Sequence, residues 1–336
     1  MQRLGLQIGS RYTLSIGELV ALAQRAEALG YDSIWLGESW GRDAFTTLTA
    51  LALHTRRIAL GTNIVPVHAR TPANLAMAAA SLAEISGGRL RLGLGISGPG
   101  VVEHWHGVPF GRASRRLRET VDILRRALRG ERVEVVGEEV TCRRFALAAP
   151  PARYPVPIYL GTIGPRNVRL TGEIADGWLP TWLPCSRIAE GLAELAEGAR
   201  KAGRAVTDLE VALQVPLYVT EDLAAGRQAV RRLIAFYAGA MGDFHREHMS
   251  RRGYAAEAQA IYEAWQRKDH EAARRAVSET MLDDLAIVGP AEACRRRLAA
   301  YVEAGITLPL LSLTSMPQAQ WLAAIEAMAP QGEAQG

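Results

Sequence analysis

Two patterns of apolar residues alternate along the chain. Short apolar runs end in small or polar residues, and longer segments carry apolar residues at helical spacing. The first short run covers 4–8, and the segment 15–29 follows the i, i+3, i+4, i+7 rule from Ile16 onward. Ser15, followed three residues later by Glu18, predicts a capping box at the start of a helix. The chain therefore begins with a strand and a helix.

The same alternation continues and predicts eight strands, nearly all followed by a helix. The expected strands are 4–8, 33–36, 58–65, 90–95, 157–160, 177–180, 209–219 and 308–313. The expected helices are 15–29, 44–54, 72–85, 114–128, 166–175, 188–202, 290–304 and 317–329. This alternation favours a parallel sheet, and eight units favour a closed (β/α)8 barrel, a TIM barrel of the α/β class. A doubly wound open sheet is the alternative, but Gln7–Ser10 after the first strand lacks its GxGxxG fingerprint.

Two segments interrupt the alternation. Residues about 132–146 alternate between polar and apolar side chains around Gly137, which predicts an antiparallel hairpin. Residues about 223–282 are helical in pattern and too long for one crossover, so we expect a helical insertion over the barrel mouth. We expect one barrel domain over 1–330 and a disordered tail over 331–336. Five residues of the insertion either line a substrate pocket or pack the insertion on the barrel: Tyr237, Met241, Phe244, His245 and Tyr254.

Composition narrows the class of protein without naming a function. Of 336 residues, 49% are hydrophobic and 22% are charged, as in ordinary globular proteins. Only Lys201 and Lys268 are lysines among 39 basic residues, so 37 are arginines. This bias reflects either a GC-rich genome or recognition of phosphate or carboxylate groups. The net charge of +4 comes without a basic stripe interleaved with aromatic residues, so we expect no nucleic-acid partner.

The sequence carries no recognisable targeting or metal-binding pattern. The N-terminus resembles neither a signal peptide nor a transit peptide, and no apolar run reaches the roughly 18 residues of a membrane helix. The three cysteines, Cys142, Cys185 and Cys294, have no zinc or disulfide spacing. The pair His104 and His106 has no third ligand nearby. We therefore expect a cytoplasmic protein with no membrane partner and no metal.

Functional side chains of a (β/α)8 barrel lie at the carboxyl ends of its strands, so these positions carry the candidate chemistry. After the second strand, Gly37–Trp40 brings a carboxylate, a hydroxyl and an indole together. The third strand contains Asn63, a polar residue in an apolar run that needs a partner when buried. Trp178 in the sixth strand either walls a planar ring or packs in the barrel core.

Two glycine-rich segments follow neighbouring strands and offer sites for an anion. Gly93–Gly100 contains four glycines, and its N–H groups together with Ser97 suit a phosphate. Gly161–Asn167 leads into a helix, whose unpaired N–H groups and dipole favour negative charge. Two such segments after adjacent strands are more specific than either one alone.

The sequence resembles the luciferase-like flavin and deazaflavin oxidoreductases over most of its length. The residues that carry the resemblance are Ala28–Trp35, Arg57–Thr62, Arg70–Pro72, Ser86–Arg89 and Ala175–Trp178. Ile96–Pro99 together with Trp105–Gly107 is similar to the branch that uses coenzyme F420 and includes methylenetetrahydromethanopterin reductase-like proteins.

The resemblance implies an oxidoreductase that moves a hydride between C5 of coenzyme F420 and an unidentified small organic substrate. Two alternatives remain open. One is a monooxygenase that uses reduced FMN and oxygen, and the other is a cofactor-binding protein without turnover. Homodimers are common in the family, so we expect a homodimer as well.

The resemblance also implies site residues. It places a non-prolyl cis peptide that supports the deazaflavin ring at Asn63–Ile64, and phosphate contacts in the two glycine-rich segments. The proton donor is open between Glu38, Glu103 and His104, because the glutamate acid of the glucose 6-phosphate enzyme is replaced by Gly98. Together with Trp178 as a candidate ring wall, the expected cofactor contacts are Glu38, Ser39, Asn63, Ile64, Val65, Ser97, Gly98, Gly161, Thr162, Ile163, Gly164 and Trp178.

A minority of the arginines has a candidate role in this scheme. Coenzyme F420 is anionic, with a phosphate and a glutamate tail, and some arginines stand where that tail is expected to leave the barrel. These are Arg42, Arg112, Arg115, Arg116 and Arg166.

Overall fold

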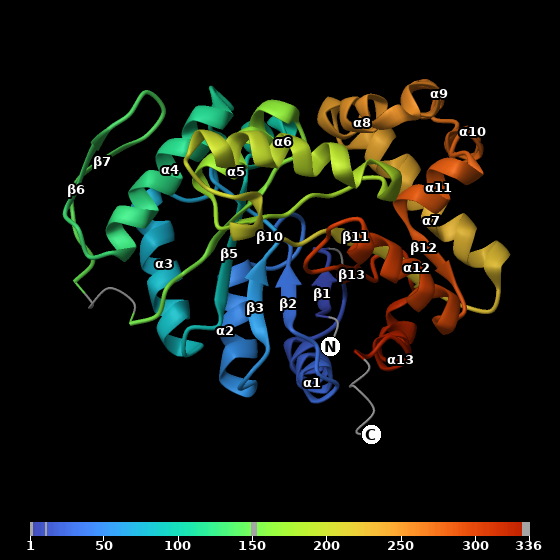
Figure 1. Ribbon diagram of the computed structural model, residues 1–336, viewed down its shortest axis with the longest axis horizontal. Helices are drawn as coiled ribbons and strands as arrows, with labels where there is room; N and C mark the ends of the chain where they lie inside the picture. Colours follow the sequence, from blue (N-terminus) through green and yellow to red (C-terminus); the bar gives the residue numbers. More distant parts are fainter. Residues whose placement is uncertain (1–2, 11, 149–152, 331–336) are drawn as a thin grey trace.

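The computed structural model describes residues 3–10, 12–148 and 153–330, which form a barrel of parallel strands surrounded by helices (Figure 1). Seven barrel strands pair in the order β9, β8, β5, β3, β2, β1, β13. Their bounds are Gly177–Trp178 (β9), Ile158–Gly161 (β8), Leu90–Gly95 (β5), Ala59–Thr62 (β3), Ser33–Leu36 (β2), Gly5–Ile8 (β1) and Leu310–Ser312 (β13). The predicted α/β barrel is confirmed.

The remaining barrel strand, the seventh in chain order, is split, and its two halves close the barrel. They are β10 (Glu210–Val211) and β11 (Gln214–Val219), where the sequence predicted one strand over 209–219. Between them, the Ala212 N–H donates to a carbonyl of β9 at 2.8 Å, and the Leu213 carbonyl accepts from an N–H of β13 at 2.8 Å. The strand is divided because its successive residues pair with different neighbours.

The helices that follow the strands cover the outside of the barrel. Ser15 and Glu18 form the predicted capping box at the first helix, and the Thr71 hydroxyl accepts from the Asn74 N–H at the third. Except at the last helix, the predicted ends agree with the observed ones to within one residue. The helices are α1 (Ile16–Ala28), α2 (Ala44–His54), α3 (Pro72–Ile85), α4 (Ala113–Leu128), α5 (Pro165–Ile174), α6 (Ile188–Lys201), α12 (Ala291–Glu303) and α13 (Trp321–Ala327).

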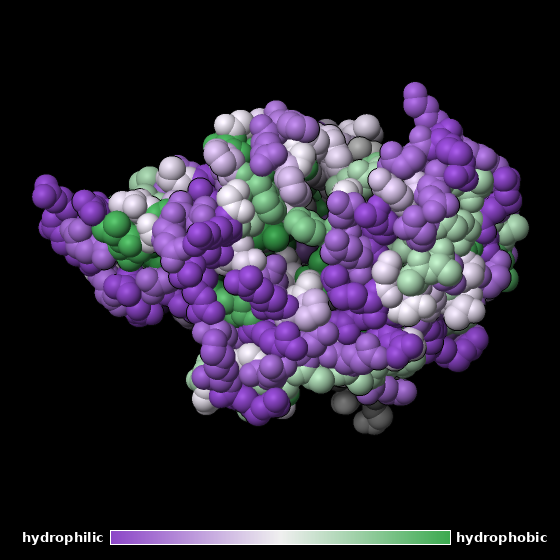
Figure 2. All heavy atoms as spheres, turned by 90° about the horizontal axis from the view of Figure 1, so that it is seen from above, coloured by the Kyte–Doolittle hydropathy of each residue, from purple (hydrophilic) through white to green (hydrophobic). Residues whose placement is uncertain are grey.

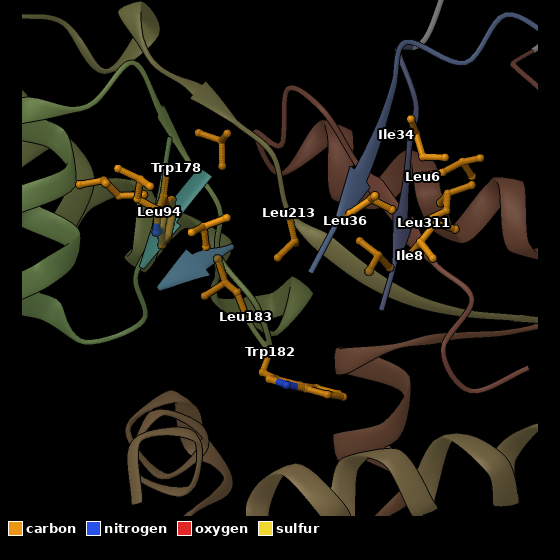
Figure 3. Close-up of a cluster of buried hydrophobic side chains, with 14 of the residues drawn as sticks. Leu6, Ile8, Ile34, Leu36, Leu94, Trp178, Trp182, Leu183, Leu213 and Leu311 are labelled. Atoms are coloured by element: carbon orange, nitrogen blue, oxygen red, sulfur yellow. The ribbon is translucent and has the colours of Figure 1, made fainter. Parts of the chain in front are cut away.

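Apolar side chains fill both faces of the strands. A larger layer joins strands to helices, and in it Leu6, Ile34 and Leu311 from adjacent strands lie side by side (Figure 3). The barrel interior holds a smaller cluster of Trp35, Tyr159, Leu179, Ala212, Leu308 and Leu310. Because the interior is packed with side chains, a ligand site has to lie at the barrel mouth.

Both predicted insertions are confirmed. The hairpin consists of β6 (Val133–Val136) and β7 (Thr141–Phe145), which pair antiparallel. A short strand that the sequence did not predict, β12 (Ile287–Gly289), follows the helical insertion and pairs with β11. The predicted tail 331–336 lies outside the described residues. The insertion contains α7 (Leu223–Ala240), α8 (Asp243–Met249), α9 (Ala255–Gln266), α10 (His270–Arg275) and α11 (Glu279–Leu285).

Among the residues that the structure describes, no helix combines the length and the apolar character needed to cross a lipid bilayer.

Candidate active site

A cavity of about 430 Å³ opens at the carboxyl ends of the barrel strands. Figure 2 looks onto this end of the molecule and shows a central hollow with hydrophobic residues on its walls. The barrel supplies one side of the cavity, and one face of α7 supplies the other. The prediction that the insertion covers the barrel mouth is thereby confirmed. The lining residues of α7 are spaced i, i+3, i+4, i+7, i+8, as Ala229, Arg232, Leu233, Phe236 and Tyr237.

The third barrel strand is broken at the edge of this cavity. It resumes as β4 (Val65–Pro66) after a non-prolyl cis peptide bond between Asn63 and Ile64, as the resemblance implied. Ile64 lines the cavity, and its side chain also lies against two glycines. A Cβ on Gly95 would come within 2.9 Å of Ile64, and a Cβ on Gly161 within 2.7 Å. These two positions therefore need glycine, because any side chain would push Ile64 out of place.

Of the residues near this break, some line the cavity and others are buried in the core. Asn63 and Ser39 line the cavity, and the Ser39 hydroxyl is hydrogen-bonded to that of Ser10. Val65 is fully buried and pairs with Leu94 in the sheet, so its side chain belongs to the core. Its contact with a cofactor stays a prediction.

Glu38 lines the cavity as an ion-paired carboxylate. Its two oxygens accept from the Arg70 guanidinium at 2.5 and 3.0 Å, and one of them also accepts from the Ala44 N–H at 2.9 Å. Arg70 also binds Asp43, the N-cap of α2, and lies over the Phe45 ring. Burial lowers the pKa of Arg70, but the hydrogen bonds and charges of the two carboxylates outweigh burial and raise it. Glu38 therefore ties the loop after β2 to the start of α2.

Glu103 and His104 lie in a π-helical turn, Val101–Trp105, after β5. Both are exposed, and neither lines the cavity. A Glu103 carboxylate oxygen accepts from the Phe110 N–H at 3.4 Å. Their role as proton donor stays a prediction. No group of three or more histidine, cysteine or carboxylate side chains placed to hold a metal occurs in the described part of the chain.

Aromatic rings join this turn to the insertion across the cavity. Trp40 contacts Trp105 with ring centroids 5.2 Å apart, and contacts Phe236 of α7 at 6.4 Å. Tyr237, the next residue of α7, lies 4.8 Å from the Trp182 ring. Among the five insertion residues singled out in the sequence, Tyr237 lines the cavity, whereas the Tyr254 hydroxyl donates to Asp284 at 2.7 Å. The insertion thus both lines the pocket and packs on the barrel.

The two glycine-rich segments lie next to each other, because Gly95 of β5 pairs with Gly161 of β8. Beyond Gly95, Ser97 adopts a left-handed backbone with φ of 59°, and nothing lies within 4 Å of a Cβ added to Gly98. Beyond Gly161, Gly164 is equally open and begins α5 without a side-chain cap. Left-handed turns and uncapped helix starts both suit anions.

The Thr162 hydroxyl and the carbonyls of Thr162 and Ile163 form hydrogen bonds within the protein. The Thr162 hydroxyl is hydrogen-bonded to that of Thr171 at 2.8 Å, and its carbonyl accepts from the Trp178 ring N–H at 2.9 Å. The Ile163 carbonyl lies 2.8 Å from a ring nitrogen of His248 in α8. The hydroxyl of Thr162 is therefore committed within the protein, and its contact with a cofactor phosphate stays a prediction.

Trp178 lies in the core and does not line the cavity. Its side chain is 1% exposed, and a Cβ on Gly191 of α6 would lie 2.8 Å from the far edge of its ring. The expectation that Trp178 walls a bound ring is therefore wrong for this cavity. The ring faces outward to α6, and its N–H holds the loop after β8 through Thr162.

His248 fastens the insertion to two barrel loops. Its ring nitrogens lie 2.8 Å from the Ile163 carbonyl and 3.0 Å from the Trp182 carbonyl. Burial, aided by the Arg252 charge, lowers the pKa of His248 to about 3, so the neutral ring donates to one of these carbonyls at a time. This residue was not predicted, because a histidine in a helical segment carries no local signal of its partner.

A polar network at the base of the cavity was not predicted from the sequence either. The Ser312 hydroxyl donates to Gln7 at 3.0 Å, accepts from Gln214 at 3.4 Å and lies 3.1 Å from the Thr314 hydroxyl. Gln7, Gln214 and Thr314 all line the cavity. Gln7 interrupts an apolar strand as Asn63 does, and this signal could have identified it.

Most of the arginines expected near a cofactor tail have partners elsewhere. Arg112 and Arg115 bind Glu138 in the hairpin, and Arg116 donates to the Glu139 carbonyl at 3.2 Å. These three arginines attach the hairpin to α4. The fourth, Arg42, lies over the Tyr12 ring at 5.1 Å. Arg166, in the first turn of α5, is exposed and has no side-chain hydrogen bond or ion pair among the described residues.

The sequence model of the luciferase-like monooxygenases matches residues 4–308. The chain belongs to this family. The luciferase-like chain is 35% identical, over 96% of its length and 98% of the relative's, to a Mycobacterium tuberculosis protein provisionally named a coenzyme F420-dependent oxidoreductase. It is 31% identical to 5,10-methylenetetrahydromethanopterin reductase of Methanolobus tindarius, over 85% of this chain and 86% of that one. The family resemblance seen in the sequence is confirmed.

Solved structures share the fold of this luciferase-like chain. The F420-dependent tetrahydromethanopterin reductase of Methanopyrus kandleri has a TM-score of 0.84 at 24% identity, covering 98% and 97% of the two chains. An F420-dependent secondary alcohol dehydrogenase with an F420–acetone adduct has a TM-score of 0.79 at 20% identity, covering 98% of both. A Baeyer–Villiger monooxygenase of Pseudomonas putida with FMN has a TM-score of 0.69 at 17% identity, covering 98% and 97%.

Proposed function

We propose that this protein is an F420-dependent oxidoreductase that transfers a hydride between C5 of the deazaflavin ring and a small organic substrate. The observation that carries the proposal is the wedge formed by Ile64 between Gly95 and Gly161 at the broken third strand. Ile64 gives the cavity an apolar surface for a flat ring, and the two glycine-rich loops beside it suit the phosphate to which the ring of F420 is joined. The F420-dependent relatives support the same choice.

The residues present fit such a cofactor. Gly98 and Gly164 leave open space beside backbone N–H groups, and no side chain caps the start of α5. Arg166, at the same helix start, adds a cation that has no hydrogen bond or ion pair among the described residues. We assign Ile64 and Asn63 to the ring, and Ser97, Gly98 and Gly161–Gly164 to the phosphate. When bound, F420 supplies a carbon that carries the hydride, and these residues fix its position.

Glu38 has a different task in this proposal from the one first expected. Among the three candidate proton donors, Glu38 is the one that lines the cavity. Both of its carboxylate oxygens already accept hydrogen bonds within the protein, from the Arg70 guanidinium and from the Ala44 N–H. We assign Glu38 to positioning the loop after β2, next to Ser39.

Separate titrations of the purified protein with F420 and with FMN test the proposal. We expect saturable binding of F420, followed by reduction or oxidation of the bound cofactor with a panel of small substrates. The monooxygenase alternative, favoured by the FMN-bound structural neighbour, predicts tight binding of FMN and none of F420. F420 binding without turnover on any substrate favours the third alternative, a cofactor-binding protein.

Three further expectations belong to the same proposal. We propose that residues 1–330 act as one barrel domain, that two copies form a homodimer, and that the protein works in the cytoplasm. Light scattering during size-exclusion chromatography tests the dimer, and a mass equal to one chain of 36.4 kDa would overturn it.

A further inference from the structure

The cavity face of α7 carries one charged residue, Arg232. The helix contains three arginines and no acidic residue. Two of them are held by α11, because Arg227 binds Glu279 and Asp283, and Arg231 binds Glu279. Arg232 is exposed and has no hydrogen bond or ion pair among the described residues. The guanidinium that borders the cavity is thus the one of the three without a counterion.

Among the described residues, the rest of the cavity lining leaves this charge uncompensated. Glu38, the other charged lining residue, is already neutralised by Arg70. The other polar side chains of the described lining are neutral: Gln7, Ser10, Ser39, Trp40, Asn63, Gln214, Tyr237, Thr314 and Ser315. An arginine in this position is suited to an anionic group of a ligand, because its planar donors match a carboxylate.

Apolar and aromatic side chains lie beside Arg232. Leu233 and Phe236 are on the same face of α7, and the Trp40 ring contacts Phe236 from the barrel side. Trp40 is 42% exposed, and Trp105, which contacts it, is 46% exposed, although tryptophan is usually well buried. Exposed aromatic rings at a cavity mouth suit a flat apolar body of a ligand.

We propose that the substrate is an organic acid, with a carboxylate that pairs with Arg232 and a flat apolar body that lies against Leu233, Phe236 and Trp40. The assignment of this molecule as a hydride donor or acceptor rests on the proposed function, whereas its binding does not. Arg232 is then the residue that determines specificity, and it acts on the part of the substrate remote from the reacting carbon.

The test compares cinnamate with cinnamamide, which have nearly the same shape and differ in charge. Binding of each is measured by calorimetry to the wild type and to Arg232→Gln, Arg232→Lys and Arg200→Gln. Arg200 is a matched control, because it is exposed on α6 and has no side-chain hydrogen bond or ion pair among the described residues. We expect cinnamate to bind the wild type at least about tenfold more tightly than the amide. This preference is lost in Arg232→Gln, partly retained in Arg232→Lys and unchanged in Arg200→Gln.

Three results would overturn the proposal: equal affinity of the wild type for both probes, a preference that survives in Arg232→Gln, or no cinnamate binding below about 1 mM. The same samples are titrated with F420. A carboxylate preference without F420 binding contradicts the proposed function and leaves the role of Arg232 standing. F420 binding without a carboxylate preference contradicts the role of Arg232 and leaves the proposed function standing.

Discussion

The ion pair between Glu38 and Arg70 gives the sharpest test of how the cavity is built. Replacing Glu38 by Gln keeps an oxygen for the Ala44 N–H but removes the charge that faces the guanidinium. The new amide also turns an N–H₂ group toward Arg70, which has only donors. Arg70 keeps Asp43 as a partner, so its charge is not left alone.

The size of the effect follows from the burial of the pair. The side chains of Glu38 and Arg70 are 14% and 16% exposed, so the pair lies between a surface pair and a buried one. Surface pairs contribute about 0–1 kcal/mol, and breaking a buried pair costs about 3–5 kcal/mol. Because Asp43 remains, we expect Glu38→Gln to lower the free energy of unfolding by about 2 kcal/mol. In a chain of this size, that corresponds to a drop in Tm of roughly 3 °C.

Calorimetric melting and single-turnover oxidation of reduced F420 across pH measure this effect. The control is Asp43→Asn, which removes the more exposed carboxylate, 44% exposed, from the same guanidinium and is expected to cost under about 1 kcal/mol. If Glu38 positions the loop, the variant is less stable and the shape of its pH–rate profile is unchanged. An unchanged Tm together with loss of one limb of the profile would show that Glu38 exchanges the proton, and the positioning role would be wrong.

Three other changes test the cofactor loops and the insertion. Gly161→Ala should displace Ile64 and raise the Kd for F420 roughly tenfold. The control is Gly100→Ala, which should leave the Kd unchanged because nothing lies within 4 Å of a Cβ added there. Equal Kd values in the two variants would contradict the packing of Ile64 between Gly95 and Gly161. Arg166→Gln should weaken the binding of F420 more than the binding of a deazaflavin without the anionic tail, and this difference should shrink at high salt. Equal weakening of both would refute an anion site. The pKa of His248 is lowered to about 3 in the folded protein. As the pH falls below about 6.5, this histidine therefore binds a proton in the unfolded chain but not in the folded one. The free energy of unfolding consequently falls as the pH is lowered from about 6.5 towards 3. In His248→Gln, the loss of unfolding free energy between pH 7 and 5 should shrink by up to about 2 kcal/mol, and an unchanged loss would disprove the buried neutral ring.

Elements set by local rules were predictable from the sequence. The helix Pro72–Ile85 has its predicted bounds because Thr71, the proline at its start and the apolar spacing all act within a few residues. The short strand Ile287–Gly289 was missed, because three residues carry too little periodicity to separate them from the helices on either side. The break at Asn63–Ile64 was expected from the family resemblance alone, since no local propensity points to it.

The side-chain environment of the site was much harder to predict. Glu38 and Arg70 are 32 residues apart, and nothing local indicates that they pair. Trp178 shows a second limit. Both faces of a barrel strand are apolar, one toward the interior and the other toward the helices, so an aromatic residue in such a strand gives no sign of its direction. The structure turns this ring outward to α6, where it supports the loop after β8.

The cavity is assembled from two parts of the molecule that are under different constraints. The barrel side depends on close packing, since Ile64 fits between Gly95 and Gly161 with no room for a Cβ. The α7 side depends on a helix whose opposite face already packs on the protein through Val230, Ile234 and Ala238. At Arg232, an exposed cavity-facing position, a substitution therefore alters what the pocket accepts without removing buried apolar contacts.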